Sequence, residues 1–258
     1  MTVLNSIVPQ TQLALVRKSN PTPQTHRRPE ANPVPMRRYD IAYLDSDGSA
    51  QHRQIVAPAT PVFECGFSAF ARGTVIKTST GPCAVEDLMV GEDILTEEFG
   101  ALPLTWRGGM TLIPNAPAID PETQRLTRVI SDTFGVGRPA SDLLLGPGAR
   151  LTRRAPSGQL RLVDATELAD GESIVRTTPP TPVQVYHICL PMQATISANG
   201  IGVASFHPGL TLSQTLGPNM LKLFMSLFPQ ATTVSDFGAQ LSPPKEPAPS
   251  YADELDFA

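Results

Sequence analysis

Short runs in which apolar and polar residues alternate fill the middle of the chain, a pattern typical of strands with one buried face. Between residues 61 and 209 glycine and proline separate these runs, and helical periodicity is weak. The pattern predicts strands at 75–78, 93–96, 102–106, 143–145, 173–176, 183–188, 194–198 and 201–205. The last two flank Asn199-Gly200, a dipeptide well suited to a two-residue hairpin turn. Many short strands at even spacing predict an all-β domain.

A β-hairpin is expected just upstream of this domain, over residues 39–60. Tyr39, Ile41 and Tyr43 alternate with other residues, as in a half-buried strand. Turn-forming residues follow at 45–48, after which the chain can return antiparallel. We interpret this segment as a hairpin that links the N-terminal part of the chain to the β-domain.

One helix is expected after the β-domain, within residues 212–229. Gly217-Pro218 offers a start, because proline is well tolerated at the first helical position. Apolar residues then recur on one face, at Met220, Leu223, Phe224, Leu227 and Phe228. A helix that lies on a membrane surface would carry several basic residues, and this one has only Lys222. We therefore expect it to pack against the β-domain.

The ends of the chain differ from its middle in composition. The 258 residues include 27 prolines, about twice the usual share of about 5%, and these gather toward both ends. Residues 1–38 carry six basic residues and one acid, which predicts a disordered, proline-rich basic arm. Residues 230–258 carry five acids and one lysine, which predicts a disordered acidic tail. We prefer two solvated tails that prevent aggregation; the alternative is that they attract each other or recruit a partner.

Charge and cysteine usage exclude several classes of function. A net charge of −4 favours neither nucleic acid nor an anionic membrane, and no apolar run is long enough to span a bilayer. No signal peptide is recognisable at the N-terminus, which favours a cytoplasmic protein. The three cysteines lie far apart without a CxxC pair, so we expect reduced thiols and neither a metal nor another cofactor. A metal site built from His187, His207 and a cysteine lacks any local ligand spacing.

Four segments, in this order, resemble the signatures of the Hint family, the fold shared by hedgehog autoprocessing domains, inteins and many bacterial Hint proteins. Residues 69–76 are similar to the family's opening strand, which normally begins Cys-Phe, and residues 85–96 to its turn with Gly-acid followed by a strand. Residues 143–150 resemble the segment that usually reads Ser/Thr-Pro-x-His, and 198–206 the closing hairpin. The resemblance covers about residues 61–209 and implies a Hint-type β-fold.

The resemblance also implies a reaction in which a thiol attacks the preceding carbonyl while Thr and His assist. In this chain the reactive positions are occupied by Ala69 for Cys, Gly146 for Ser/Thr and Ala149 for His. A further Asp-Arg-His-Glu cluster of bacterial members is matched by residues 191–194, Pro-Met-Gln-Ala. Because a methyl group cannot act as a nucleophile, we expect an autoprocessing-deficient Hint protein that serves as a scaffold or binding module for a protein or peptide.

Two alternatives remain at the level of sequence. Ser68 or Cys65 could attack its own preceding carbonyl and cleave the chain near residues 64–69, with His187 as a further candidate. A shift of one residue along a strand turns Ser68 to the opposite face, so a surface serine, a packed thiol and a hydrogen-bonded structural histidine are the preferred interpretation. The other alternative is a ligand in a vacated cleft beside Ala69 and Ala149. Splicing is excluded, because no asparagine has the required His before it and nucleophile after it.

Overall fold

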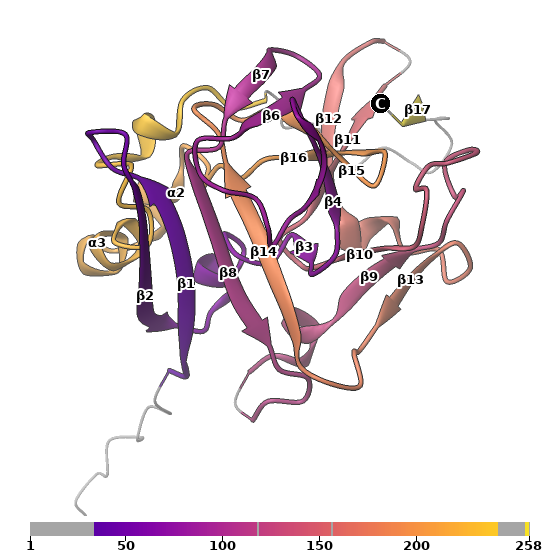
Figure 1. The fold of residues 1–258 in the computed structure, drawn as a ribbon. Helices are drawn as coiled ribbons and strands as arrows, with labels where there is room; N and C mark the ends of the chain where they lie inside the picture. Colours follow the sequence, from indigo (N-terminus) through magenta and orange to yellow (C-terminus); the bar gives the residue numbers. More distant parts are fainter. Residues whose placement is uncertain (1–33, 118, 156, 242–255, 258) are drawn as a thin grey trace, which may run out of the picture. The chain divides into compact units, whose positions relative to one another are not determined.

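Two antiparallel β-sheets form the body of the protein (Figure 1). The computed structural model describes residues 34–117, 119–155, 157–241 and 256–257. Residues 1–33 of the predicted arm and 242–255 and 258 of the predicted tail lie outside the described residues. The expectation that the arm extends to residue 38 is wrong, because residues 36–38 begin a β-strand. The all-β prediction is therefore confirmed for the part of the chain that the structure describes.

The first sheet has eight strands, in the order β13-β9-β10-β3-β14-β8-β1-β2. Their bounds are β1 (Met36–Leu44), β2 (Ala50–Pro58), β3 (Phe70–Ala71), β8 (Trp106–Leu112), β9 (Leu126–Val129), β10 (Leu143–Leu145), β13 (Ile174–Thr177) and β14 (Val183–Cys189). The longest pairing inside it joins β1 to β2 from Met36–Pro58 to Leu44–Ala50, and β14 pairs with β8 from Val183–Leu112 to Cys189–Trp106.

The second sheet has nine strands and follows the order β12-β11-β16-β15-β4-β6-β7, with β5 paired to β4 and β17 to β11. Their bounds are β4 (Val75–Thr78), β5 (Gly81–Ala84), β6 (Asp93–Thr96), β7 (Gly100–Pro103), β11 (Arg150–Arg154), β12 (Leu160–Asp164), β15 (Thr195–Ala198), β16 (Ile201–Ala204) and β17 (Asp256–Phe257). The turn between β15 and β16 is Asn199-Gly200, with φ values of 48° and 87°. This left-handed pair is the conformation that the dipeptide predicted.

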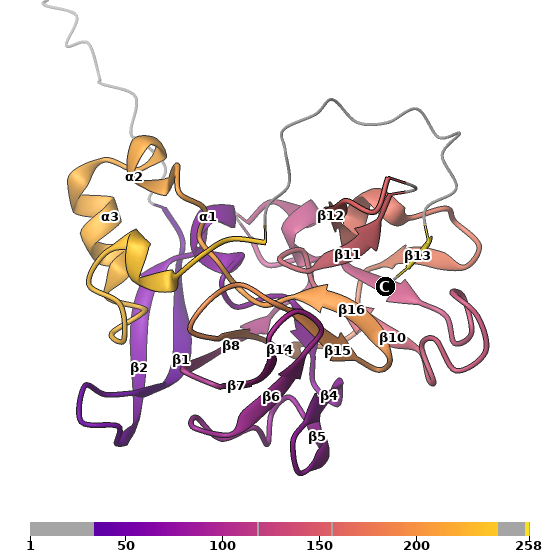
Figure 2. The same cartoon turned by 90° about the horizontal axis from the view of Figure 1, so that it is seen from above.

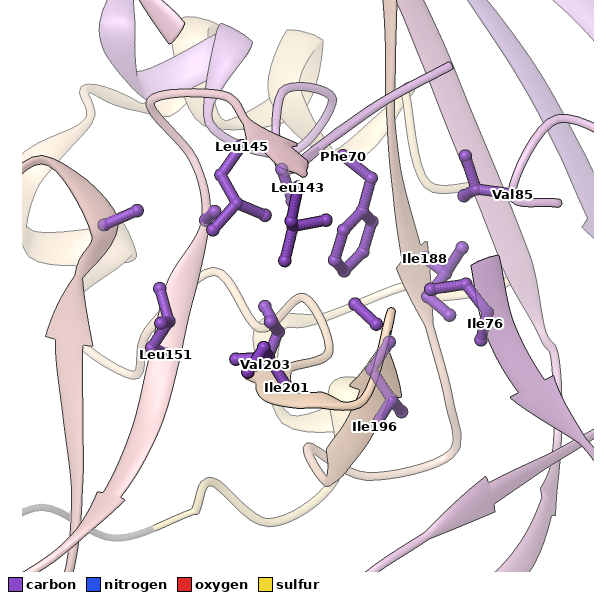
Figure 3. Close-up of a cluster of buried hydrophobic side chains, with 14 of the residues drawn as sticks. Phe70, Ile76, Val85, Leu143, Leu145, Leu151, Ile188, Ile196, Ile201 and Val203 are labelled. Carbon is purple, nitrogen blue, oxygen red and sulfur yellow. The ribbon is translucent and has the colours of Figure 1, made fainter. Parts of the chain in front are cut away.

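An aliphatic core is built from residues of both sheets (Figure 3). Its members include Phe70, Ile76, Leu145, Ile188, Ile196 and Val203, all fully buried. The side chains drawn in Figure 3 point toward one another from β3, β4, β10, β14, β15 and β16. Burial of this apolar surface supplies much of the driving force for the fold.

A second core is aromatic and joins the upstream hairpin to the C-terminal segment. β1 is an interior strand, paired with β2 on one side and with β8 on the other. The buried aromatic residues of this core are Tyr39, Tyr43, Phe63, Phe67, Trp106, Phe206, Phe224, Phe228 and Phe237. The indole of Trp106 fills the space over Gly108, where a Cβ would lie 2.1 Å from the ring, and its Nε1 donates to the Leu227 carbonyl at 2.9 Å. The hairpin predicted as a linker is thus part of the sheet.

The C-terminal helical segment differs from the prediction of one helix over 212–229. It forms α2 (Leu212–Thr215) and α3 (Pro218–Met225), separated at Gly217, which is extended with ψ of 159°. Proline disfavours the α conformation in the residue before it, which explains the break. Figure 2 shows α3 beside β1 and β2, and its Phe224 packs 5.6 Å from Phe63. The remaining helices are short: α1 (Pro61–Glu64), η1 (Pro121–Gln124), η2 (Ala165–Leu168) and η3 (Val234–Phe237).

Two further expectations are wrong in part. The strand predicted at 102–106 is divided between β7 and β8 in different sheets; Leu104 N donates to Glu92 O and Thr105 N to Cys189 O, so these residues turn the chain. The tail predicted from residue 230 is folded as far as residue 241, because Phe237 is 4% exposed and lies 5.3 Å from Phe228. None of the described helices is long and apolar enough to cross a membrane.

Candidate functional site

Ala69 lies at the point where the loop after α1 enters β3. Its N–H donates to the Tyr186 carbonyl of β14, and its carbonyl accepts the Gly146 N–H, both at 2.9 Å. Ala69 and Ala149 are each 0% exposed and belong to the aliphatic core. No water-sized space therefore touches either methyl group, and the expectation of a vacated ligand cleft at these two residues is wrong.

The loop from Gly146 to Ala149, between β10 and β11, packs on the backbone of residues 65–68. A Cβ on Gly146 would lie 2.1 Å from the Ser68 carbonyl oxygen, and one on Gly148 would lie 2.3 Å from the Cys65 carbonyl oxygen. The Gly148 N–H donates to the Ser68 carbonyl at 2.9 Å. Heavy atoms cannot approach so closely, so a serine or threonine at position 146 is incompatible with this backbone. The carbonyl that precedes Ala69 occupies the place of the missing side chain.

Ser68 is buried at 0% exposure, and its Oγ has no hydrogen-bond partner. The expectation of a surface serine is therefore wrong. The reason is that Ser68 does not lie in a strand: it precedes β3 and is covered by the Gly146–Ala149 loop. An unpartnered buried hydroxyl costs about 1–3 kcal/mol. Because no acceptor receives its proton, nothing activates this hydroxyl as a nucleophile.

The Cys65 thiol is also poorly suited to attack. Its Sγ donates to the Val62 carbonyl at 3.1 Å. Burial raises the pKa of Cys65 to about 11, although the positive charge of Arg150 acts in the opposite direction. The thiol is therefore protonated near neutral pH, and the thiolate is the reactive form.

His187 lies on β14, and the structure makes it a neutral, buried side chain. Its Nδ1 accepts the Ile188 N–H at 3.0 Å, and its ring meets the rings of Phe70 and Phe206 edge to face at 5.7 and 5.3 Å. Burial, and then the charge of Arg150, lowers the pKa of His187 to about 3. An imidazole with this pKa is not a proton donor near neutral pH.

His207 follows β16 and is fully buried. Its Nδ1 accepts the Gly209 N–H at 3.0 Å, and its Nε2 lies 3.2 Å from the Gly238 carbonyl, to which it donates. Burial lowers the pKa of His207 as well. Within the described part of the chain, no three His, Cys, Asp or Glu side chains gather as a metal site would require.

Arg150 is the residue that sequence reasoning missed. It begins β11 directly after Ala149, and its guanidinium donates to the His207 carbonyl at 3.4 Å. Its positive charge is close enough to Cys65, His187 and His207 to act on all three pKa values in the lowering direction, although burial raises the pKa of Cys65 overall. The signal in the sequence is a basic residue next to the position matched to the family's histidine. A cation at this place opposes the formation of an imidazolium.

The segment matched to the family's second polar cluster is covered by the C-terminal chain. Gln193 is 2% exposed; its Nε2 donates to Ser205 O, and its Oε1 accepts the Leu241 N–H at 3.1 Å. A Cβ on Gly238 would lie 2.3 Å from the Pro191 carbonyl. Beside this contact is a hollow of about 290 Å³ lined by Leu44, Thr105, Cys189, Leu190, Pro191, Gln230, Ala231, Asp236 and Phe237. Residues 191–194, which match the polar cluster, are thus packed against residues 238–241.

A family model and several solved structures match the β-domain of this chain. The sequence profile of the Hint domain matches residues 68–210. Solved structures similar to this chain include a splice-inactive variant of the AceL NrdHF class 3 split intein, at 12% identity and a TM-score of 0.39, covering 54% of this chain and 97% of that one. A bacterial intein-like domain from Clostridium thermocellum matches at 18% identity and a TM-score of 0.36, covering 54% of this chain and 99% of that one. A DnaB intein from Synechocystis sp. PCC 6803 matches at 12% identity and a TM-score of 0.32, covering 54% and 99%.

No curated protein matches the chain. The Hint profile nevertheless spans more than half of the 258 residues and begins at the buried Ser68 that precedes β3. The chain belongs to the Hint-domain family.

Proposed function

We propose that this protein is a Hint-domain protein that does not cleave itself and that it acts as a scaffold or binding module for a protein or peptide partner. The observation that carries the proposal is the state of the three matched reactive positions. Ala69 and Ala149 are buried methyl groups, and Gly146 has no room for a side chain. The acyl shift of the family requires a nucleophile at the first of these positions, and none is there.

The β1–β2 hairpin, which lies upstream of Ala69, also bears on the proposal. In a self-cleaving arrangement the chain before the nucleophile would be released. Here β1 pairs with β8 over Tyr39–Met110 to Tyr43–Trp106, and Phe67 packs 5.1 Å from Trp106 and 4.5 Å from Tyr39. A break between residues 64 and 69 would leave the hairpin bound to the domain through the sheet and the aromatic core. The hairpin is therefore an integral part of the folded domain and not a segment that a cut would release.

Intact mass under denaturing conditions tests the proposal. Purified full-length protein is incubated for a long period with and without a thiol reductant, and the mass of the unfolded chain is then measured. We expect only the full-length mass in both samples. Size-exclusion chromatography alone would miss a cut, because the two pieces would stay paired through β1 and β8. A stoichiometric fragment ending at Phe67 or Glu64 would overturn the proposal.

A second candidate is autoproteolysis through Ser68 or Cys65, and one observation favours it. The Ser68 hydroxyl is fully buried without a partner, an arrangement that costs stability and calls for an explanation. Ser68→Ala and Cys65→Ala variants separate the candidates: if the full-length protein is cut and one variant is not, that residue is the nucleophile. If wild type and both variants all remain whole, the second candidate is rejected.

We also propose a cytoplasmic location. Cys65, Cys83 and Cys189 are all unpaired, which suits a reducing compartment. Thiol titration of the unfolded protein, isolated under non-reducing conditions from its own cells, should find three free thiols; a blocked or bridged thiol would contradict the proposed location.

A further inference from the structure

One edge of β11 stops pairing within its own sheet after a single residue pair. β11 pairs with β12 along its full length, from Arg150–Asp164 to Arg154–Leu160. On its other side it pairs with β16 only at Leu151–Val203. The next residues along this edge, Arg153 and Arg154, are paired antiparallel with β17, in the register Arg153–Phe257 and Arg154–Asp256. Figure 1 shows the short yellow arrow of β17 near β11.

The β11–β12 hairpin is strongly basic at this edge. Arg153 lies directly opposite Arg161, and Arg154 is exposed. Burial, and then the charge of Glu98, raises the pKa of Glu97, and the nearby positive charge of Arg154 acts in the opposite direction. An acidic strand beside β11 would lie next to the positive charge of Arg154.

The chain supplies such a strand. Residues 253–257 read Asp-Glu-Leu-Asp-Phe, three acids without a basic residue. We propose that the edge of β11 at Arg153 and Arg154 is a strand-addition site for an acidic peptide, and that the chain's own C-terminal segment occupies this site in cis. Main-chain hydrogen bonds to an open sheet edge supply affinity in this kind of recognition, and the arginine charges supply selectivity. The proposal does not depend on whether the protein cleaves itself.

Occupancy in cis has a measurable consequence. A tethered segment competes at an effective concentration on the order of millimolar. A free acidic peptide with an intrinsic dissociation constant of about 100 μM would therefore appear about tenfold weaker toward the occupied edge than toward an empty one. Any partner that uses this edge must displace β17 first.

The experiment uses the full-length protein and a fluorescent peptide of residues 250–258 as the probe. Asp256→Pro removes a backbone donor from β17 and disfavours its pairing, whereas Ala248→Pro adds the same residue outside β17. We expect the peptide to bind the Asp256→Pro protein about tenfold more tightly than wild type or Ala248→Pro. Equal affinity for all three proteins, or no binding to the Asp256→Pro protein, would overturn the proposal.

Two further measurements test the chemistry and the connectivity. In the Asp256→Pro background, Arg154→Glu should weaken peptide binding at least tenfold and Lys222→Glu, a charge reversal on α3, should not; equal effects would contradict recognition by the β11 edge. Sedimentation should find a monomer for both wild type and Asp256→Pro. A wild-type dimer that becomes a monomer in Asp256→Pro would show that the segment is exchanged between two copies, which would overturn occupancy in cis.

Discussion

Replacing Phe228 with alanine should cost this protein a large part of its stability. Phe228 is fully buried at the centre of the aromatic core. Its ring lies 4.6 Å from Trp106, 5.2 Å from Phe206 and 5.3 Å from Phe237. Truncation of a buried phenylalanine costs about 3–5 kcal/mol, because the transfer free energy is lost and a cavity is left. For a domain of this size that corresponds to a fall in Tm of about 6–20 °C.

Urea unfolding followed by tryptophan fluorescence measures this loss directly, because Trp106 is the only tryptophan and touches the substituted ring. Met220→Ala is the matched control: it removes a large apolar side chain from α3, but that side chain is 38% exposed. We expect the control to change the free energy of unfolding by less than about 1 kcal/mol. A loss below about 1 kcal/mol for Phe228→Ala, with an unchanged denaturant slope, would refute the view that the C-terminal segment completes the core.

Three other substitutions test separate parts of the structure. Gly108→Ala should destabilise by about 1–3 kcal/mol, since its Cβ would lie 2.1 Å from the Trp106 ring, whereas Gly217→Ala, with open space around it, should cost less in the same urea assay. Arg37→Met should cost about 3–5 kcal/mol, because it leaves Glu64 buried without its partner at 2.6 Å; if Arg37→Met/Glu64→Leu does not recover most of this loss, the buried charge is not the cause. His187 has a folded pKa of about 3 against 6.5 when free, so below pH 6.5 the unfolded state takes up a proton that the folded state does not. As the pH falls below 6.5, this group should therefore lower the free energy of unfolding by up to about 1.4 kcal/mol per pH unit. His187→Phe should make the free energy of unfolding depend less on pH between pH 6 and 4, as measured by urea unfolding at each pH. An unchanged pH dependence in the variant would contradict a buried neutral imidazole.

The strands that could be predicted are those whose local pattern decides their structure. β4, β6 and β10 lie where alternation and flanking glycines place them, and Asn199-Gly200 makes its turn without help from distant residues. The strand predicted at 102–106 was wrong because Leu104 and Thr105 bond to Glu92 and Cys189, partners that no local pattern identifies.

The candidate site also has parts that the sequence predicts and parts that depend on distant residues. The resemblance of residues 69–76 and 143–150 to family signatures predicts which positions are inert, and that assignment stays a prediction. The burial of Ser68 could not be predicted, because it results from a loop 78 residues later that packs backbone against backbone. Arg150 was missed for a related reason: its reach to Cys65 and His187 depends on the meeting of the two sheets, which spacing in the sequence does not describe.

The hydrogen bond from Trp106 to Leu227 spans 121 positions in the chain. On a ribosome, β1 and β2 emerge well before β8 and far ahead of the residues that cap the indole. A lone two-stranded hairpin is marginal in water, so the nascent N-terminal half must wait with its tyrosines and phenylalanines uncovered. Translation that stalls before residue 237 would therefore leave an aggregation-prone intermediate, and chaperone demand should fall once both Phe228 and Phe237 are available.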